Sequence, residues 1–193
     1  MRNATVALAL ACGLLGVCCV SCGESQEFSG WLSTGYQETS LEEAVNLTGV
    51  PIPTYLPEGY EIQEVLIETF HKERPQYNEV VLLVSDKEIE KRVSARTNAE
   101  DSYKGYDYKC KMEIDVRWTE DGGPGKPPCG EIDQDCKLVH MNGGGWLVVR
   151  GDSRVFLFYP SGAKPGFQIV ITAGKGLPEG ELLKVAESMN YLA

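Results

Sequence analysis

The chain has 193 residues, a formal net charge of −10 and 42% hydrophobic residues. This length and apolar content suit one folded domain with a real core and exclude a globally disordered chain. The acidic balance repels phosphate backbones, so we expect no nucleic-acid partner.

The N-terminus has the layout of a secretory signal. Arg2 supplies a positive start, and the stretch from Ala4 to Val20 is uncharged and mostly apolar. Its end, Cys19-Val20-Ser21-Cys22, resembles a bacterial lipobox, whose last cysteine carries the lipid. We therefore predict a signal peptide over residues 1–21 and lipidation at Cys22. The alternatives are ordinary secretion and an uncut anchor, although the apolar stretch is shorter than the about 20 residues that a spanning helix needs.

Residues 22–39 are polar and contain Gly and Ser, which predicts a lipidated tether. We expect one domain over residues 40–193. Ser40 and Glu43 have the spacing of a capping box that opens a helix, and Gly49 and Pro51 end it.

The next segments predict strands. Residues 62–67, together with Phe70, and residues 80–84 are expected to pair as a hairpin, although the alternation slips over residues 65–67. Residues 86–96 fit either an exposed edge strand or a helix. Residues 98–108 are interpreted as a polar connection rich in Tyr.

The second half continues the strand pattern. Residues 112–116 alternate as a strand with one buried face, and residues 121–136 are expected to form a loop. Residues 146–149 and 155–159 predict a hairpin, residues 167–171 a last strand, and residues 182–189 a helix with an apolar stripe. The fold class is α+β: a single antiparallel sheet, flat or curved, with an N-terminal and a C-terminal helix packed on one face.

Two ends of this domain resemble the DUF4367 family of extracytoplasmic domains. The similar segments are Ser40-Leu41-Glu42-Glu43-Ala44, Pro53-Thr54-Tyr55-Leu56-Pro57-Glu58-Gly59-Tyr60, Gly144-Gly145-Trp146 and the closing run from Glu181 to Met189. The resemblance covers the two ends of residues 40–190 and leaves residues 87–136 unaligned. It implies a place on lipoproteins or membrane-anchored regulators of the bacterial envelope, and it brings no catalytic residues.

The cysteines are the main chemical constellation of the domain. Export favours oxidation, and Cys129 and Cys136 lie seven residues apart in a turn-rich segment, so they are the predicted disulfide. Cys110 is then left over as a buried thiol, or as one whose pKa the neighbouring lysines lower. The alternative is a zinc site of Cys110, Cys129, Cys136 and His140.

No other pattern predicts chemistry. Acidic residues such as Asp115 are interpreted as solvated surface, and the glycine-rich segments lack the Ser or Thr of a phosphate loop. We therefore expect no enzyme activity and no cofactor. The leading hypothesis is a lipid-anchored binding or sensory module of the envelope that recognises an envelope protein or a wall component. The alternatives are a carrier that holds an apolar ligand under a curved sheet and an unrecognised envelope enzyme.

The lipid prediction can be tested by labelling. Radiolabelled palmitate should enter the wild-type chain and not the Cys22→Ala variant, because the thiol of Cys22 is the expected attachment point. Immunoprecipitation followed by autoradiography measures the label. Equal labelling of the two proteins would exclude Cys22 as the lipid site.

Overall fold

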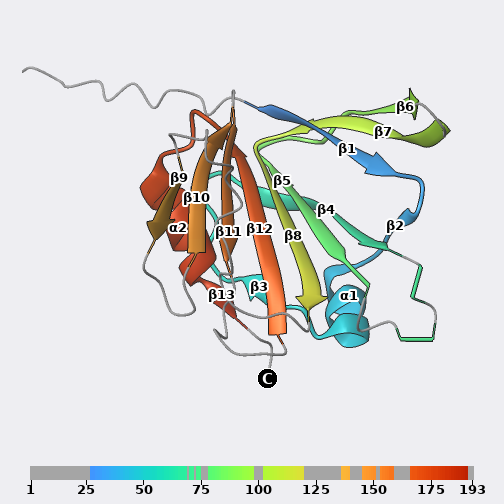
Figure 1. Cartoon of the computed structure of the whole chain (residues 1–193), viewed down its shortest axis with the longest axis horizontal. Helices are drawn as coiled ribbons and strands as arrows, with labels where there is room; N and C mark the ends of the chain where they lie inside the picture. The colour runs from blue at the N-terminus through green and yellow to red at the C-terminus, as the bar shows by residue number, and fades with distance from the viewer. Residues whose placement is uncertain are drawn as a thin grey trace, which may run out of the picture.

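The structure, a computed structural model, describes residues 27–68, 70–71, 73–74, 78–97, 102–119, 136–139, 145–150, 153–158 and 166–190. Strands dominate it, together with two short helices, α1 (Leu41–Thr48) and α2 (Glu179–Glu187) (Figure 1). Within these residues no helix is long and apolar enough to cross a membrane. The signal peptide and Cys22 lie outside the described residues.

The described strands pair antiparallel in a main sheet, a three-stranded sheet and a short ladder. The order of the main sheet is β2 (Tyr36–Glu38), β4 (Glu61–Glu68), β5 (Val80–Ser85), β8 (Met112–Thr119), β12 (Gly166–Gly174), β11 (Ser153–Phe158), β10 (Gly145–Arg150), β9 (Cys136–Val139). The three-stranded sheet is β1 (Phe28–Ser33), β7 (Ser102–Cys110), β6 (Lys91–Thr97), and the ladder is β3 (Ile52–Pro53) with β13 (Met189–Asn190).

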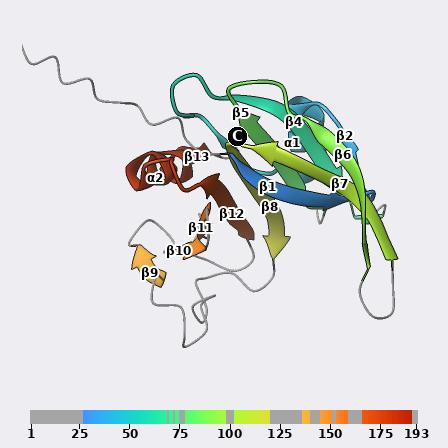
Figure 2. The ribbon, with the colours of Figure 1, turned by 90° about the horizontal axis from the view of Figure 1, so that it is seen from above.

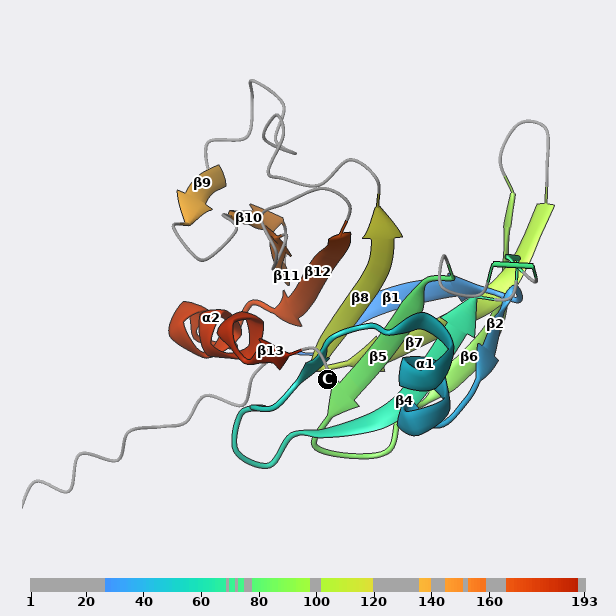
Figure 3. The same cartoon turned by 90° about the horizontal axis from the view of Figure 1, so that it is seen from below.

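One face of the main sheet carries the larger hydrophobic core. Leu82 of β5, Ile114 of β8 and Ile171 of β12 are fully buried. They belong to one cluster with Ala44 of α1 and Leu182 of α2. Both helices therefore cover this face; in Figure 3, α1 lies by β4 and β5 and α2 lies by β11 and β12. Each large aliphatic side chain buried here contributes roughly 1.5–3 kcal/mol.

The opposite face of β4 and β5 carries a second core. Leu66, Val81 and Leu83 cluster there with Phe28 and Leu32 of the three-stranded sheet, which lies over this face. The prediction of a single sheet is therefore wrong. Its error has a physical cause: both faces of β5 are apolar, and the second face needs a cover that the two helices do not provide.

This double burial also explains the slipped alternation in β4. Val65 and Ile67 face the helix side, whereas Leu66 faces the three-stranded sheet, so three consecutive residues are buried. The register against β5 also shifts between Ile62 and Glu64. The predicted hairpin of β4 and β5 is confirmed. Phe70 is not part of the strand; it follows β4 and is 68% exposed.

Two segments predicted as irregular are strands. Phe28 to Glu38, inside the predicted tether, form β1 and β2, so this part of the segment belongs to the folded body. Residues 102–110, predicted as a polar connection, form β7, which pairs with β1 and β6. The ambiguous segment before it supplies the edge strand β6, whose residues are mostly exposed. Its charged side chains protect this edge from pairing with other chains.

A sharp bend joins the two sheets. β7 ends at Cys110 and β8 begins at Met112, so the chain passes from one sheet to the other across Lys111. The main chain of Lys111 is held on both sides: its N–H donates to the carbonyl of Val84 at 3.1 Å, and its carbonyl accepts from Gly174 at 3.1 Å. The bend therefore fixes where the two sheets diverge.

The terminal helices follow the sequence pattern closely. The Ser40 hydroxyl accepts from the N–H of Glu43 at 3.1 Å, and Gly49 ends α1 with a φ of 68°, a conformation that favours glycine. The Glu43 carboxylate accepts the hydroxyl of Thr39 at 2.8 Å. The predicted C-terminal helix is α2, although Met189 already belongs to β13. The predicted hairpin of β10 and β11 and the strand β12 are also confirmed.

The position of α2 in the core gives a stability test. Leu182 is completely buried and Glu187 is exposed on the same helix. Leu182→Ala should lower the free energy of unfolding by about 2–5 kcal/mol, the usual cost of a cavity at a buried leucine. Urea unfolding followed by circular dichroism measures this.

Glu187→Ala is the matched control, and it should change the free energy of unfolding by less than about 0.5 kcal/mol. Equal midpoints for the two variants would show that α2 is a peripheral tail and not part of the core.

Candidate functional site

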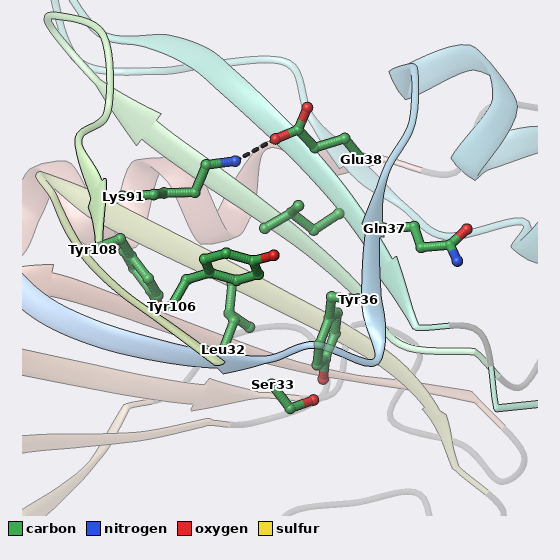
Figure 4. A pocket seen from close by; sticks show the side chains of 9 residues that line it. Leu32, Ser33, Tyr36, Gln37, Glu38, Lys91, Tyr106 and Tyr108 are labelled. Carbon is green, nitrogen blue, oxygen red and sulfur yellow. Dashed lines mark hydrogen bonds and ion pairs between the residues drawn. The ribbon is translucent and has the colours of Figure 1, made fainter. Parts of the chain in front are cut away.

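A cavity of about 490 Å³ lies between the three-stranded sheet and the edge of the main sheet (Figure 4). Its size falls in the range of ligand pockets in proteins, roughly 300–1,000 Å³. The cavity lies where β1, β6 and β7 pass over β2 and β4. We call it the tyrosine cleft.

Three tyrosines and two leucines form its apolar wall. Leu66 of β4 and Tyr36 of β2 come from the main sheet, and Leu32, Tyr106 and Tyr108 come from the three-stranded sheet. Tyr108 is almost fully buried, whereas Tyr106 is 36% exposed. Figure 4 shows the Tyr106 ring in the middle of the cleft, above Leu32 and beside Tyr36. The cleft thus offers an aromatic surface that solvent reaches.

The position of Tyr108 in this wall requires a glycine at Gly30 on β1. A Cβ at Gly30 would lie 2.1 Å from the ring of Tyr108, closer than side chains approach in proteins. Gly30 therefore lets the Tyr108 side chain approach β1 closely without a clash. On the other face of the same sheet, a Cβ at Gly105 would meet the Trp31 ring at 2.5 Å. Two glycines thus allow aromatic rings to pack on either face of a thin sheet.

A charged group closes one end of the cleft. The ammonium of Lys91 on β6 contacts the carboxylate of Glu38 on β2 and that of Glu64 on β4, the latter at 2.7 Å. Partial burial lowers the pKa of Lys91, but the hydrogen bonds to Glu38 and Glu64 outweigh it and raise this pKa above its ordinary value. Lys91 is therefore a cation that links the two sheets across the cleft.

Tyr36 connects the cleft to a group of buried carboxylates. Its ring lines the cleft, and its hydroxyl donates to Glu79 at 2.5 Å. Burial and this hydrogen bond raise the pKa of Tyr36 well above its ordinary range. Beyond Glu79, the Arg117 guanidinium lies 3.7 Å from Glu79 and donates to Asp115 at 2.9 Å.

The prediction that Asp115 is solvated surface is wrong. Asp115 is only 8% exposed, and its Oδ1 atom is buried without a hydrogen-bond partner. Burial and the neighbouring Glu79 raise the pKa of Asp115 to about 7, against the opposing effect of Arg117. Burial, Asp115 and Glu79 likewise raise the pKa of Glu113 to about 7. Sequence alternation puts both on the solvent side of β8, but that side is largely covered.

Of the cysteines in the predicted disulfide and zinc site, only Cys110 has a described side chain. Its thiol is fully buried in the second core and donates to the carbonyl of Met112 at 3.3 Å. Burial raises the pKa of this thiol to about 12, so the flanking lysines do not make it a reactive thiolate. The buried-thiol interpretation is confirmed.

The other cysteine predictions fall largely outside what the structure describes. Cys129 and His140 lie outside the described residues, and Cys136 begins β9 without a described side chain. The disulfide of Cys129 and Cys136 and the zinc alternative therefore stay predictions. Within the described part of the chain, no group of His, Cys, Asp and Glu side chains is arranged to hold a metal ion.

The sequence analysis missed the cleft, although β7 carried a signal. Tyr106, Tyr108 and Cys110 alternate with Asp107 and Lys109, which is the period of a half-buried strand. Because polar residues lie between the tyrosines, the segment was interpreted as a polar connection and not as a strand. The partners of the tyrosines, on β2 and β4, are distant in sequence and no local pattern indicates them.

Comparisons with protein-family models, with curated proteins and with solved structures found no match to this chain. The resemblance to the DUF4367 family therefore stays a prediction.

The buried carboxylates make the stability depend on pH. Since burial raises the pKa of Glu113 from 4.5 to about 7, the folded state holds this proton more tightly than the unfolded state. The free energy of unfolding should therefore fall as the pH rises from about 4.5 to about 7. Glu113→Gln removes the ionisation, so at pH 8 this variant should exceed the wild type by about 1–3 kcal/mol.

Urea unfolding at pH 4, 6 and 8 measures this difference, which should nearly vanish at pH 4. Glu187→Gln, which removes an exposed carboxylate of α2, is the control for the loss of one surface charge. A Glu113→Gln variant that is less stable than the wild type at pH 8 would show that the ionised carboxylate stabilises the fold.

Proposed function

We propose that this protein is a lipid-anchored, extracytoplasmic binding module of the bacterial envelope, and that the tyrosine cleft is its ligand site. The observation that carries the proposal is the cavity of about 490 Å³ with a solvent-accessible aromatic wall. The lipobox-like end at Cys22 supports the anchor, and the DUF4367-like segments support a place on the outer side of a membrane.

The lining of the cleft favours binding over catalysis. Tyrosines combine a large apolar ring with a hydroxyl, and proteins use them widely to recognise ligands at low entropic cost. Tyr36 holds its phenolic proton tightly, because burial and the hydrogen bond to Glu79 raise its pKa. Lys91 is likewise kept charged by Glu38 and Glu64, so it is a poor base or nucleophile.

The carrier alternative receives less support. It places an apolar ligand under the helices, where Leu82, Ile114 and Ile171 are fully buried against α1 and α2. The described side chains there belong to one hydrophobic cluster that includes residues of both helices. The tyrosine cleft lies on the other face of the sheet and has polar groups at its mouth, which suits a ligand with both apolar and polar parts.

The enzyme alternative keeps one observation. Glu113 and Asp115 have pKa values raised to about 7, as general acids and bases often have. They are neighbours on one strand face of β8, whereas the cleft lies over β2 and β4. We therefore assign the cleft to binding and the carboxylates to the electrostatics beneath it.

Photo-crosslinking in cells tests the site. Benzoylphenylalanine placed at position 106 of the full chain should give one or a few discrete adducts, because this ring stands in the cleft and is 36% exposed. The same residue at position 187, exposed on α2, is the matched control and should give none of these adducts. Mass spectrometry of the purified chain identifies them.

A second variant ties the adducts to the cleft. Leu32→Ala removes part of the apolar wall, so it should weaken the adducts at position 106 if the chain remains folded by circular dichroism. Identical adducts at positions 106 and 187 would contradict the assignment of the cleft as the ligand site.

A further inference from the structure

The charges around the tyrosine cleft indicate the kind of ligand it takes. We propose that it binds small organic cations, namely an ammonium group attached to an apolar or aromatic body. This inference rests on the proposed function, because it names the ligand class of the same site.

The first argument is the charge balance around Glu38, which borders the tyrosine cleft. Two smaller cavities adjoin the tyrosine cleft and share Glu38 with it. The described lining of the tyrosine cleft itself carries one carboxylate, Glu38, and one cation, Lys91. The described linings of the two smaller cavities add three carboxylates and no cation: Glu43, Glu64 and Glu68. A cation entering this surface is attracted, and an anion is repelled. The net charge of −10 for the whole chain acts in the same direction.

The second argument is that the cleft already holds an ammonium group. Lys91 reaches between Glu38 and Glu64, and two carboxylates share its single charge. The Glu38 side chain is 68% exposed, so a second cation can approach it from solvent. The chain's own lysine therefore shows that this end of the cleft accepts an ammonium, and it competes with any ligand that carries one.

The third argument is the aromatic wall beside this acidic end. Tyr106 stands between Lys91 and Tyr36 in Figure 4, with its ring accessible to solvent. The face of a tyrosine ring attracts cations, and the rings of Tyr36 and Tyr106 also bury apolar substituents. A ligand with an ammonium at one end and an apolar body therefore matches both parts of the site.

One further cation lies on the same side of the three-stranded sheet. Lys104 shares the strand face of Tyr106 and Tyr108, two residues further along β7 toward the free end of the hairpin. It is exposed and is not part of the cleft lining. The free end of β6 and β7 projects beyond the main sheet in Figure 2. Lys104 lies two residues from Ser102, where β7 begins at this end.

The test compares three probes of similar size and different charge. Phenethylammonium, 2-phenylethanol and phenylacetate are titrated into the full chain in a nonionic detergent at low salt, and ligand-observed NMR measures their binding. Phenethylammonium should bind about two- to fivefold more tightly than 2-phenylethanol, as expected for an exposed ion pair, and phenylacetate should bind most weakly.

Two variants give opposite signs. Lys91→Met removes the internal competitor while keeping an apolar side chain, so it should tighten phenethylammonium binding about two- to fivefold. Glu38→Gln removes an exposed carboxylate and should weaken it by a similar factor. Glu187→Gln, far along the chain on α2, is the control and should change nothing. Probe partition into detergent is common to all variants and cancels in the comparison.

The outcomes separate this inference from the proposed function. If phenylacetate binds most tightly, the cleft is an anion site. If Lys91→Met weakens phenethylammonium binding in a chain that remains folded, Lys91 is not a competitor of the ligand. In either case the inference fails and the binding module stands. A lysine-rich peptide is titrated separately, and its binding without binding of phenethylammonium overturns the inference in favour of a protein partner. If no probe binds to the wild type or to Lys91→Met, the inference also fails, and crosslinking at position 106 then decides the proposed function.

Discussion

The burial of β5 on both faces is the constraint on which the rest of the fold depends. Every residue from Val80 to Ser85 is buried, with alternate side chains in two separate hydrophobic clusters. One cover is a pair of helices, and the other is a three-stranded sheet. A strand of this kind stabilises the fold only when both covers are in place. The second cover is formed by β1, which precedes α1 in the chain, and by β6 and β7, which directly precede β8.

This second cover is what creates the cleft. The three-stranded sheet is joined to the main sheet at Lys111, where β7 turns directly into β8, and the two sheets diverge from this bend. Near the bend the space between them is filled by Cys110 and Tyr108. Toward β2 the two sheets leave a cavity that Tyr36 and Lys91 line. The cleft is thus a consequence of covering a twisted sheet with a smaller one.

The sequence predicted the parts of this fold that depend on local signals. The helix from Ser40 to Gly49 has a capping residue at one end and a glycine at the other, and β8 and β12 alternate clearly. The sequence pattern did not predict β1, β2 and β7 as strands. These segments are polar or short, and only tertiary pairing stabilises them as strands. The cleft could not be predicted, because it requires residues as distant as Leu32 and Tyr106 to meet. Asp115 was misjudged for the same reason, since its burial comes from its neighbours in space.

The cleft and the buried carboxylates form one electrostatic unit that the main sheet holds in place. Tyr36 belongs to both: its ring borders the cleft, and its hydroxyl satisfies Glu79. Arg117 contacts Glu79 and Asp115 and offsets part of their charge, but Asp115 keeps one oxygen unpaired. The pKa values of Glu113 and Asp115 are raised to about 7, so their negative charge grows as the pH rises through this value, and in a partly desolvated environment it acts over a longer range than it does in water. The region beneath the cleft therefore adds to the attraction of a cation at its mouth, and the stability that these buried carboxylates cost is offset by the two hydrophobic cores.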